Sequence, residues 1–160
     1  MISRQTLTNT FTRENHSVKD DFFLDTAFAI ALISPKDFFH GKALELAKQV
    51  GKTKAHLVTT RAIVIEIGNA LSKESLRKSA VELIDSMEAD ETITIISISD
   101  EIYEDAFKLF RSRLDKEWGL TDCISFVVME QRGITKALTT DQHFEQAGFI
   151  ALMKKETVSL

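Results

Sequence analysis

The sequence predicts a domain of the α/β class, with a central parallel sheet of about five strands and helices on both faces, in three layers. Short runs of β-branched and aromatic residues alternate along the chain with longer stretches whose apolar residues recur at helical spacing. Strands that alternate with helices in this way form parallel sheets that are covered on both faces. The chain has one proline and six glycines, so long stretches can run as uninterrupted helix or strand.

Several short segments have the composition of strands. The first is a wholly apolar run, Phe22-Phe23-Leu24, which is typical of a strand buried on both faces. The next two are rich in β-branched residues, and the last two are weaker. The expected strands cover residues 22–24, 56–60, 93–96, 136–139 and 149–153.

The segments between these strands predict helices, because their apolar residues fall on one face. An apolar segment also follows the first strand as far as Ile33, where Ser34 and Pro35 end it. The segment 61–71 has almost no polar face, so we expect its faces other than that of Glu66 to be buried. The expected helices cover residues 37–50, 61–71, 73–87, 100–110, 122–131 and 141–146, with Ser99 and Thr121 as N-caps and Gly51 and Gly133 as stops.

Composition excludes some classes of function. The chain has 160 residues and a formal net charge of −4, whereas a protein that coats nucleic acid without specificity is basic overall. An acidic charge is compatible with a nuclease, since a metal-binding pocket contributes negative charge by itself. The length fits one domain, expected over residues 21–160, after a polar and flexible extension over residues 1–20.

The expected compartment is the reducing cytoplasm. Cys123 is the single cysteine, so no intramolecular disulfide can form, and its apolar neighbours indicate a core residue. The sequence lacks an apolar run of the ~18 residues that a membrane span needs, and the N-terminal residues lack the apolar stretch of a signal peptide.

Four acids stand in apolar surroundings, where a carboxylate is costly unless something pairs with it. Asp25 follows the first strand, Asp141 follows the fourth, and Asp122 begins an apolar helix. Glu66 lies inside the helix after the second strand. Sites in parallel sheets form at the carboxyl ends of the strands, so we expect these acids to meet there. Helix capping is the open alternative for the three aspartates, and a buried salt bridge is the alternative for each acid.

A cluster of carboxylates points to a metal ion. Like charges brought together repel one another, and a hard divalent cation such as Mg²⁺ or Mn²⁺ removes that conflict. The chemistry that uses such a pocket is phosphodiester hydrolysis. Hydroxyl groups beside the acids are candidates to orient acids or water: Thr26, Thr59, Thr139 and Thr140. Ser125 shares a helix face with Asp122, and holding the attacking water and packing against a neighbouring helix both stay open for it.

The motifs resemble those of PIN domains, specifically the VapC-type toxin ribonucleases. Residues 119–130, Gly-Leu-Thr-Asp-Cys-Ile-Ser-Phe-Val-Val-Met-Glu, resemble that family's third-acid segment. Residues 138–149, Leu-Thr-Thr-Asp-Gln-His-Phe-Glu-Gln-Ala-Gly-Phe, resemble its fourth-acid segment. Leu24-Asp25-Thr26 resembles the first motif, and Thr59-Thr60 followed by Ile65-Glu66-Ile67 resembles the second. The resemblance covers residues 21–153.

This resemblance implies an endoribonuclease that depends on Mg²⁺ or Mn²⁺, with Asp25, Glu66, Asp122 and Asp141 as metal-binding catalytic residues. It also implies a homodimer and a cognate antitoxin whose tail occupies the active-site groove. The antitoxin or dimer surface is one interpretation of the apolar residues around Phe38 and Phe39, and the core is the other.

RNA binding requires cations near the acids, because phosphate contacts dominate affinity. Arg61 and Lys36 are the candidate substrate contacts, although a solvated surface position is the alternative for both. The accessible bases of a single strand or loop make such RNA the expected target. His143 follows Asp141 by two residues, and we weigh a surface position for it against one that approaches the pocket.

Three other functions stay open. The first is an RNA-processing nuclease that has the same chemistry and no antitoxin. The second is a non-catalytic PIN-like module that binds RNA or protein, which metal affinity and turnover would separate from a nuclease. The third is a phosphotransfer receiver domain, which needs an acidic pair at the end of the first strand. Asp20 and Asp21 lie before that strand, at the wrong end.

Overall fold

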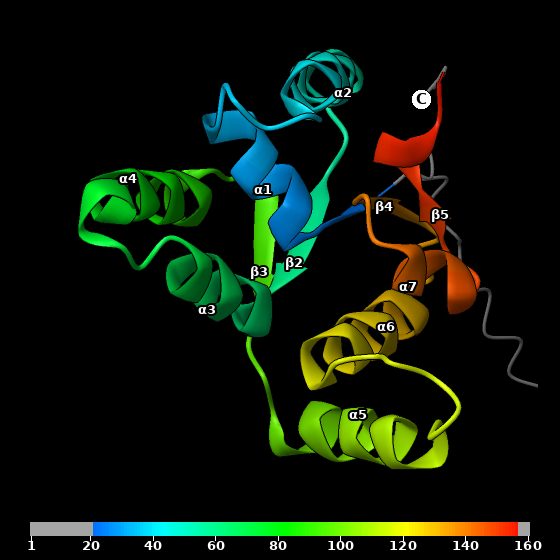
Figure 1. Ribbon diagram of the computed structural model, residues 1–160. Coiled ribbons are helices and arrows are strands. Elements are labelled where there is room, and N and C mark those ends of the chain that lie inside the picture. Colours follow the sequence, from blue (N-terminus) through cyan, green and yellow to red (C-terminus); the bar gives the residue numbers. More distant parts are fainter. Residues whose placement is uncertain (1–20, 157–160) are drawn as a thin grey trace, which may run out of the picture.

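The computed structural model describes residues 21–156 of the 160 (Figure 1). The predicted extension over residues 1–20 lies outside the described residues. Within them, no helix combines the length and the hydropathy needed to cross a bilayer.

The core of the fold is a sheet of five parallel strands in the order β3-β2-β1-β4-β5, which confirms the predicted class (Figure 1). The wholly apolar first strand lies in the centre, as expected for a strand buried on both faces. The strands are β1 (Phe22–Leu24), β2 (Leu57–Thr60), β3 (Ile93–Ile96), β4 (Lys136–Leu138) and β5 (Ile150–Ala151). The fifth strand is shorter than expected, because Leu152–Lys154 form a 3₁₀ turn, η1.

Helices cover both faces of the sheet. Figure 1 shows α1, α2 and α4 on one side of it, whereas α6, backed by α5, lies on the other. The helices are α1 (Thr26–Ile33), α2 (His40–Thr53), α3 (Arg61–Ala70), α4 (Glu74–Ala89), α5 (Asp100–Ser112), α6 (Leu120–Arg132) and α7 (Gln142–Gln146). The strand order reverses direction at the centre: β2 and β3 follow on one side of β1, and β4 and β5 lie on the other. Ligands of parallel sheets bind at the carboxyl ends of strands beside such a reversal.

Two of the four predicted cap and stop residues differ from the structure. Gly51 does not stop α2, which runs to Thr53, and Lys54 takes the left-handed conformation (φ 51°) that ends it. Thr121 is not an N-cap, because α6 begins at Leu120 with Gly119 before it. Ser99 and Gly133 do cap α5 and α6 as predicted, and Gly133 has a φ of 67°.

An aromatic cluster under the carboxyl edge of the sheet joins three of these elements. The ring of Phe144 on α7 lies 5.9 Å from that of Phe23 on β1 and 5.1 Å from that of Phe126 on α6, and all three residues are buried. Burial of each such ring contributes about 2–3 kcal/mol. The cluster therefore holds β1, α6 and α7 in fixed positions relative to one another.

Candidate active site

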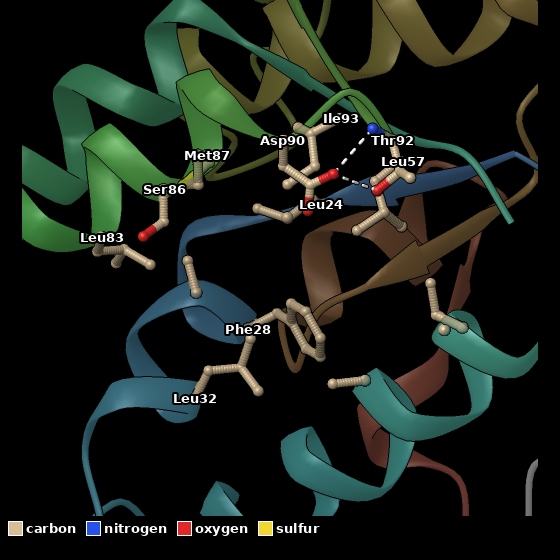
Figure 2. A pocket seen from close by; sticks show the side chains of 14 residues that line it. Leu24, Phe28, Leu32, Leu57, Leu83, Ser86, Met87, Asp90, Thr92 and Ile93 are labelled. Atoms are coloured by element: carbon tan, nitrogen blue, oxygen red, sulfur yellow. Dashed lines mark hydrogen bonds between the residues drawn. The ribbon is translucent and has the colours of Figure 1, made fainter. Parts of the chain in front are cut away.

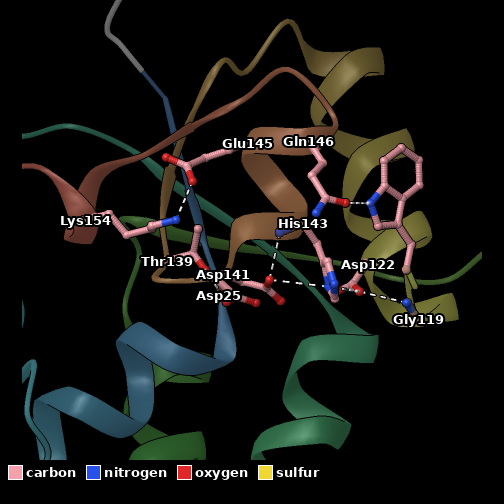
Figure 3. A network of polar contacts seen from close by, with 10 residues as sticks. Asp25, Gly119, Asp122, Thr139, Asp141, His143, Glu145, Gln146 and Lys154 are labelled. Atoms are coloured by element: carbon pink, nitrogen blue, oxygen red, sulfur yellow. Dashed lines mark hydrogen bonds and ion pairs between the residues drawn. The ribbon is translucent and has the colours of Figure 1, made fainter. Parts of the chain in front are cut away.

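All four predicted acids lie at the carboxyl edge of the sheet, at or near the N-terminal ends of α1, α3, α6 and α7. Figure 3 shows Asp25, Asp122 and Asp141 close together. Asp25 joins β1 to α1, and Asp141 is the N-cap of α7 after β4. Glu66 lies in the second turn of α3 and Asp122 in the first turn of α6. Glu66 is close enough to the three aspartates for mutual repulsion to raise pKa values in the group.

Asp25 is the most enclosed of these acids. Its side chain is 6% exposed, and its Oδ2 accepts a hydrogen bond of 2.6 Å from the hydroxyl of Thr139 on the neighbouring strand. The pKa of Asp25 is raised from 3.8 to about 6, chiefly by burial and to a smaller extent by the charge of Glu66, against the lowering effect of that hydrogen bond. Thr139 Oγ1 also accepts a hydrogen bond of 3.0 Å from the backbone N–H of Asp141. One hydroxyl thus links the first acid to the fourth.

Glu66 lies on an exposed part of α3, whereas we expected the other faces of this helix to be buried and the acid to stand in apolar surroundings. Ile65, its neighbour, is 55% exposed, so α3 has an open face on which the acid lies. The hydroxyl of Thr26, at the start of α1, donates a hydrogen bond of 3.0 Å to Glu66 Oε2. Partial burial raises the pKa of Glu66, and the charges of Asp122 and Asp141 raise it further.

Asp122 and Asp141 each cap a helix, as the alternative interpretation proposed, and they also belong to the cluster. Asp122 Oδ2 accepts a hydrogen bond of 2.8 Å from the N–H of Gly119, and Asp141 Oδ1 accepts one of 2.8 Å from the N–H of His143. Burial raises the pKa of Asp122, and the charge of Asp141 adds to this effect. Capping and clustering are therefore compatible, because a carboxylate oxygen has more than one lone pair.

His143 lies inside the site, so a surface position for it is wrong. Its Nδ1 is 3.3 Å from Asp122 Oδ2 and 3.3 Å from Asp141 Oδ1 (Figure 3). The sequence offered one signal for this position, the spacing of two residues from Asp141. The short helix α7 turns the side chain back over its own N-cap.

The other predicted residues differ in where they lie. Thr26 and Thr139 bind acids directly, and Thr140 is half-buried beside them in sequence. Ser125 is fully buried and donates its hydroxyl proton to the backbone oxygen of Thr121, which favours packing over the holding of water. Thr59 is also buried and donates to the backbone oxygen of Leu24.

Neither of the two predicted cations has an ion pair with the four acids among the described contacts. Arg61 Nη1 forms an ion pair of 2.5 Å with Glu88 Oε1 on α4. Lys36 follows the C-terminal end of α1, whereas Asp25 precedes its N-terminal end. Eight helical residues span about 12 Å, so Lys36 does not belong to the acid cluster.

The donor set fits a hard divalent cation. Ligand atoms of Asp122, Asp141 and His143 lie within 4.8 Å of one another, and Glu66 and Asp25 adjoin them. The raised pKa values of three acids show that the cluster holds its negative charge at a cost. The buried Nδ1 of His143 lies beside two carboxylate oxygens without a well-aligned hydrogen bond to either, which makes it a further donor atom for an ion. Carboxylate oxygens are the ligands that Mg²⁺ and Mn²⁺ prefer.

Comparison with known proteins identifies the family to which this chain belongs. A profile of the PIN domain family matches residues 22–150. The chain is 27% identical over 129 residues to the 23S rRNA-specific endonuclease VapC20 of Mycobacterium tuberculosis, in strain CDC 1551 / Oshkosh as in strain H37Rv, a match that covers 80% of this chain and 95% of that protein.

The fold is similar to a solved structure of the same relative. The crystal structure of Mycobacterium tuberculosis VapC20, described as a sarcin-ricin loop cleaving toxin, superposes with a TM-score of 0.71 at 25% identity. The superposition covers 81% of this chain and 96% of that one. The predicted resemblance to VapC-type toxin ribonucleases is thus confirmed, and the chain belongs to the PIN domain family.

Proposed function

We propose that this chain is a divalent-metal-dependent endoribonuclease in which Asp25, Glu66, Asp122 and Asp141 form the catalytic centre. The observation that carries the proposal is the convergence of these four acids at the reversal point of the sheet. The nuclease domain extends over residues 21–160. The activity agrees with that of the PIN-domain relatives.

Each residue has a distinct part in this proposal. The four acids hold Mg²⁺ or Mn²⁺, and the bound ion supplies an activated water and stabilises charge on the scissile phosphate. Thr139 orients Asp25 and the loop of Asp141 through its two hydrogen bonds. Thr26 holds Glu66 toward the aspartates from the start of α1. The aromatic cluster beneath keeps β1, α6 and α7 from shifting when the ion binds.

The proposed substrate is structured ribosomal RNA, because the relative with a matching fold is an endonuclease specific for 23S rRNA. In a loop of RNA the bases are unpaired, so the bases and the scissile phosphate can reach a site at the edge of a sheet. Ribosomes lie in the cytoplasm of bacteria, and the proposed substrate therefore implies a cytoplasmic protein.

The test is cleavage of purified ribosomal RNA and of a mixed RNA pool with Mg²⁺, with Mn²⁺ and with EDTA. Asp122→Asn keeps the shape of the side chain and removes one charged ligand, so we expect cleavage to fall by at least about a hundredfold. Asp85→Asn, on the exposed side of α4, is the matched control and should leave the rate unchanged. Cleavage that persists in EDTA, or that Asp122→Asn leaves intact, would contradict the proposal.

We further propose a cognate antitoxin as a protein partner, whose tail occupies the active-site groove and which also contacts the side of α1, α2 and α4. These helices and the sheet enclose an apolar cavity of about 290 Å³ (Figure 2). Leu32, Leu83 and Met87 line it, and at one end Asp90 accepts hydrogen bonds from Thr92.

A cavity of this kind fits apolar side chains of an amphipathic segment. The test is co-purification with the product of an adjacent gene, with Leu83→Glu expected to abolish binding. A retained complex would exclude this surface.

The proposed homodimer uses the exposed side of α5. Tyr103, Phe107 and Phe110 are 46%, 40% and 42% exposed, and Leu114 just beyond the helix is 91% exposed. The ring of Phe107 stacks with those of Tyr103 and Phe110, at centroid distances of 6.1 and 6.4 Å respectively. Together these side chains expose about 400 Å² of mainly apolar surface. In a standard interface each partner buries ~800 Å², and a little more than half of that area is apolar. The exposed apolar surface of α5 is close to this apolar part.

The spacing of these four residues, 4-3-4, is that of a coiled-coil stripe. Charges on α5 favour an antiparallel pair of two copies, because its first half is acidic and its second half is basic. An antiparallel pair places Glu104 near Arg111 of the partner subunit. Phe107→Glu should yield a monomer in sedimentation equilibrium, whereas the control Lys108→Glu should stay dimeric. A monomeric wild-type chain would refute this surface.

A further inference from the structure

The Nδ1 atom of His143 is buried in the site, although 21% of the side chain is exposed. It lies within ion-pair distance of Asp122 and Asp141, but no well-aligned hydrogen bond joins it to any described residue. It points between Asp122 Oδ2 and Asp141 Oδ1, which lie at the same distance of 3.3 Å (Figure 3). A buried polar atom without a well-aligned hydrogen bond is unfavourable, so its position requires an explanation.

The distances match those between ligands of one ion. Nitrogen–oxygen hydrogen bonds measure about 2.7–3.2 Å, and the contacts of His143 are longer than that range. Two adjacent ligands of an octahedral ion at ~2.1 Å from the metal lie about 3.0 Å apart. The three ligand atoms also lie within 4.8 Å of one another, as the ligands of a single ion must.

We propose that His143 binds the catalytic cation through Nδ1, beside Asp122 and Asp141, and that this nitrogen favours Mn²⁺ over Mg²⁺. The inference rests on the proposed metal-dependent function and adds a ligand to its four acids. Imidazole suits transition-metal ions, whereas Mg²⁺ prefers oxygen ligands. A site of oxygen atoms alone would discriminate less between the two ions.

A charged imidazole is the competing explanation, and it makes the opposite prediction. A protonated His143 would pair with Asp122 and Asp141 and would compete with the cation for them. Removing the ring would then strengthen metal binding. If Nδ1 is a ligand, removing the ring weakens binding, by about tenfold or more for Mn²⁺ and by less for Mg²⁺.

The experiment measures Mn²⁺ bound to the full chain by pulsed electron paramagnetic resonance, without any RNA. A ligating imidazole produces modulation of the Mn²⁺ signal by its ¹⁴N nucleus. We expect this modulation in the wild type and in Gln142→Ala, an exposed control on the same helix, and its loss in His143→Ala. His143→Asp replaces nitrogen by oxygen at the same place. It should bind Mn²⁺ without the modulation and should narrow the preference for Mn²⁺ over Mg²⁺ in titration calorimetry.

Two results would overturn the inference. One is a Mn²⁺-loaded wild type that lacks ¹⁴N modulation, and the other is an affinity for Mn²⁺ that stays equal or rises in His143→Ala. Cleavage of RNA by the same wild-type protein with Mg²⁺ is measured separately. If cleavage persists and the nitrogen signal is absent, the proposed function stands and only the role of His143 is refuted. Circular dichroism of each variant verifies its fold.

Discussion

Asp25→Asn is expected to stabilise the metal-free protein while it abolishes metal-dependent cleavage. The carboxylate lies in a nearly closed pocket between β1 and β4, where its charge is poorly solvated without an ion. Asparagine has the same shape and carries no charge. Its amide oxygen can still accept the hydrogen bond from Thr139.

The magnitude follows from the pKa of Asp25. Its rise from 3.8 to about 6 corresponds to roughly 3 kcal/mol of lost stability at neutral pH. A group whose pKa is higher in the folded protein stabilises the fold most when protonated, and this contribution is lost as the pH rises through the folded value. The difference between variant and wild type is therefore near zero below pH 3.8, grows between 3.8 and about 6, and is complete above that. Because the amide also needs hydrogen bonds, we expect a gain of about 1–3 kcal/mol.

The assay is thermal unfolding in EDTA at pH 4 and at pH 8. At pH 8 the melting temperature of Asp25→Asn should exceed that of the wild type by roughly 3–10 °C, and at pH 4 the two should agree. Mn²⁺ at a thousand times its Kd should reverse the order, because it stabilises the wild type by about 4.1 kcal/mol. Asp85→Asn, an exposed substitution, should lie within about 0.5 kcal/mol of the wild type throughout.

The outcome that refutes this reasoning is a variant less stable than the wild type at pH 8 in EDTA. A gain in stability that is the same at pH 4 and pH 8 would equally exclude the charge of Asp25 as its cause. Either result would mean that Asp25 is satisfied by the protein alone.

Three further predictions concern single side chains and pH. Thr139→Val removes the hydroxyl that donates to Asp25, so the pH at which Mn²⁺ binding is half-maximal should rise. The control Thr140→Val should leave this pH nearly unchanged. Equal shifts in the two variants would show that the hydrogen bond from Thr139 is not what sets this pH. Cleavage by the wild type should decline as the pH falls below about 6, where Asp25 becomes protonated, and a flat rate down to pH 5 would contradict this. Gly133→Ala should destabilise the fold by about 1–2 kcal/mol in urea unfolding, because φ is 67° there, whereas Gly51→Ala, inside α2, should stabilise it by about 0.5–1 kcal/mol.

Several features of the fold follow from local sequence. Short apolar runs alternate along the chain with segments whose apolar residues have helical spacing, and this order predicts the parallel sheet. It can be read from the sequence because the side-chain period and the length of each segment are local properties. The place of the acids at strand ends follows in turn, since parallel strands bring their carboxyl ends to one edge. Asp122 and Asp141 could be assigned most easily because each lies within a continuous motif of a dozen residues.

Helix ends were predicted less well, because they depend on competing local contacts. Gly51 is a favourable stop by composition, yet the backbone hydrogen bonds of α2 continue past it to Lys54. Asp122 accepts a hydrogen bond from the N–H of Gly119, and α6 therefore begins at Leu120, one residue before Thr121.

The electrostatic character of the site could not be obtained from the sequence. Local apolar neighbours make Glu66 look like the buried acid, whereas the structure exposes it and encloses Asp25. The enclosure of Asp25 depends on Thr139, which is 114 positions away in the chain and lies beside it because β1 pairs with β4. The position of His143 over Asp122 likewise depends on the packing of α7 against α6. The sequence alone determined which residues can carry charge and that acids such as Asp25 follow strands. The tertiary structure decided which of the acids are desolvated, because desolvation depends on neighbours that are distant in sequence.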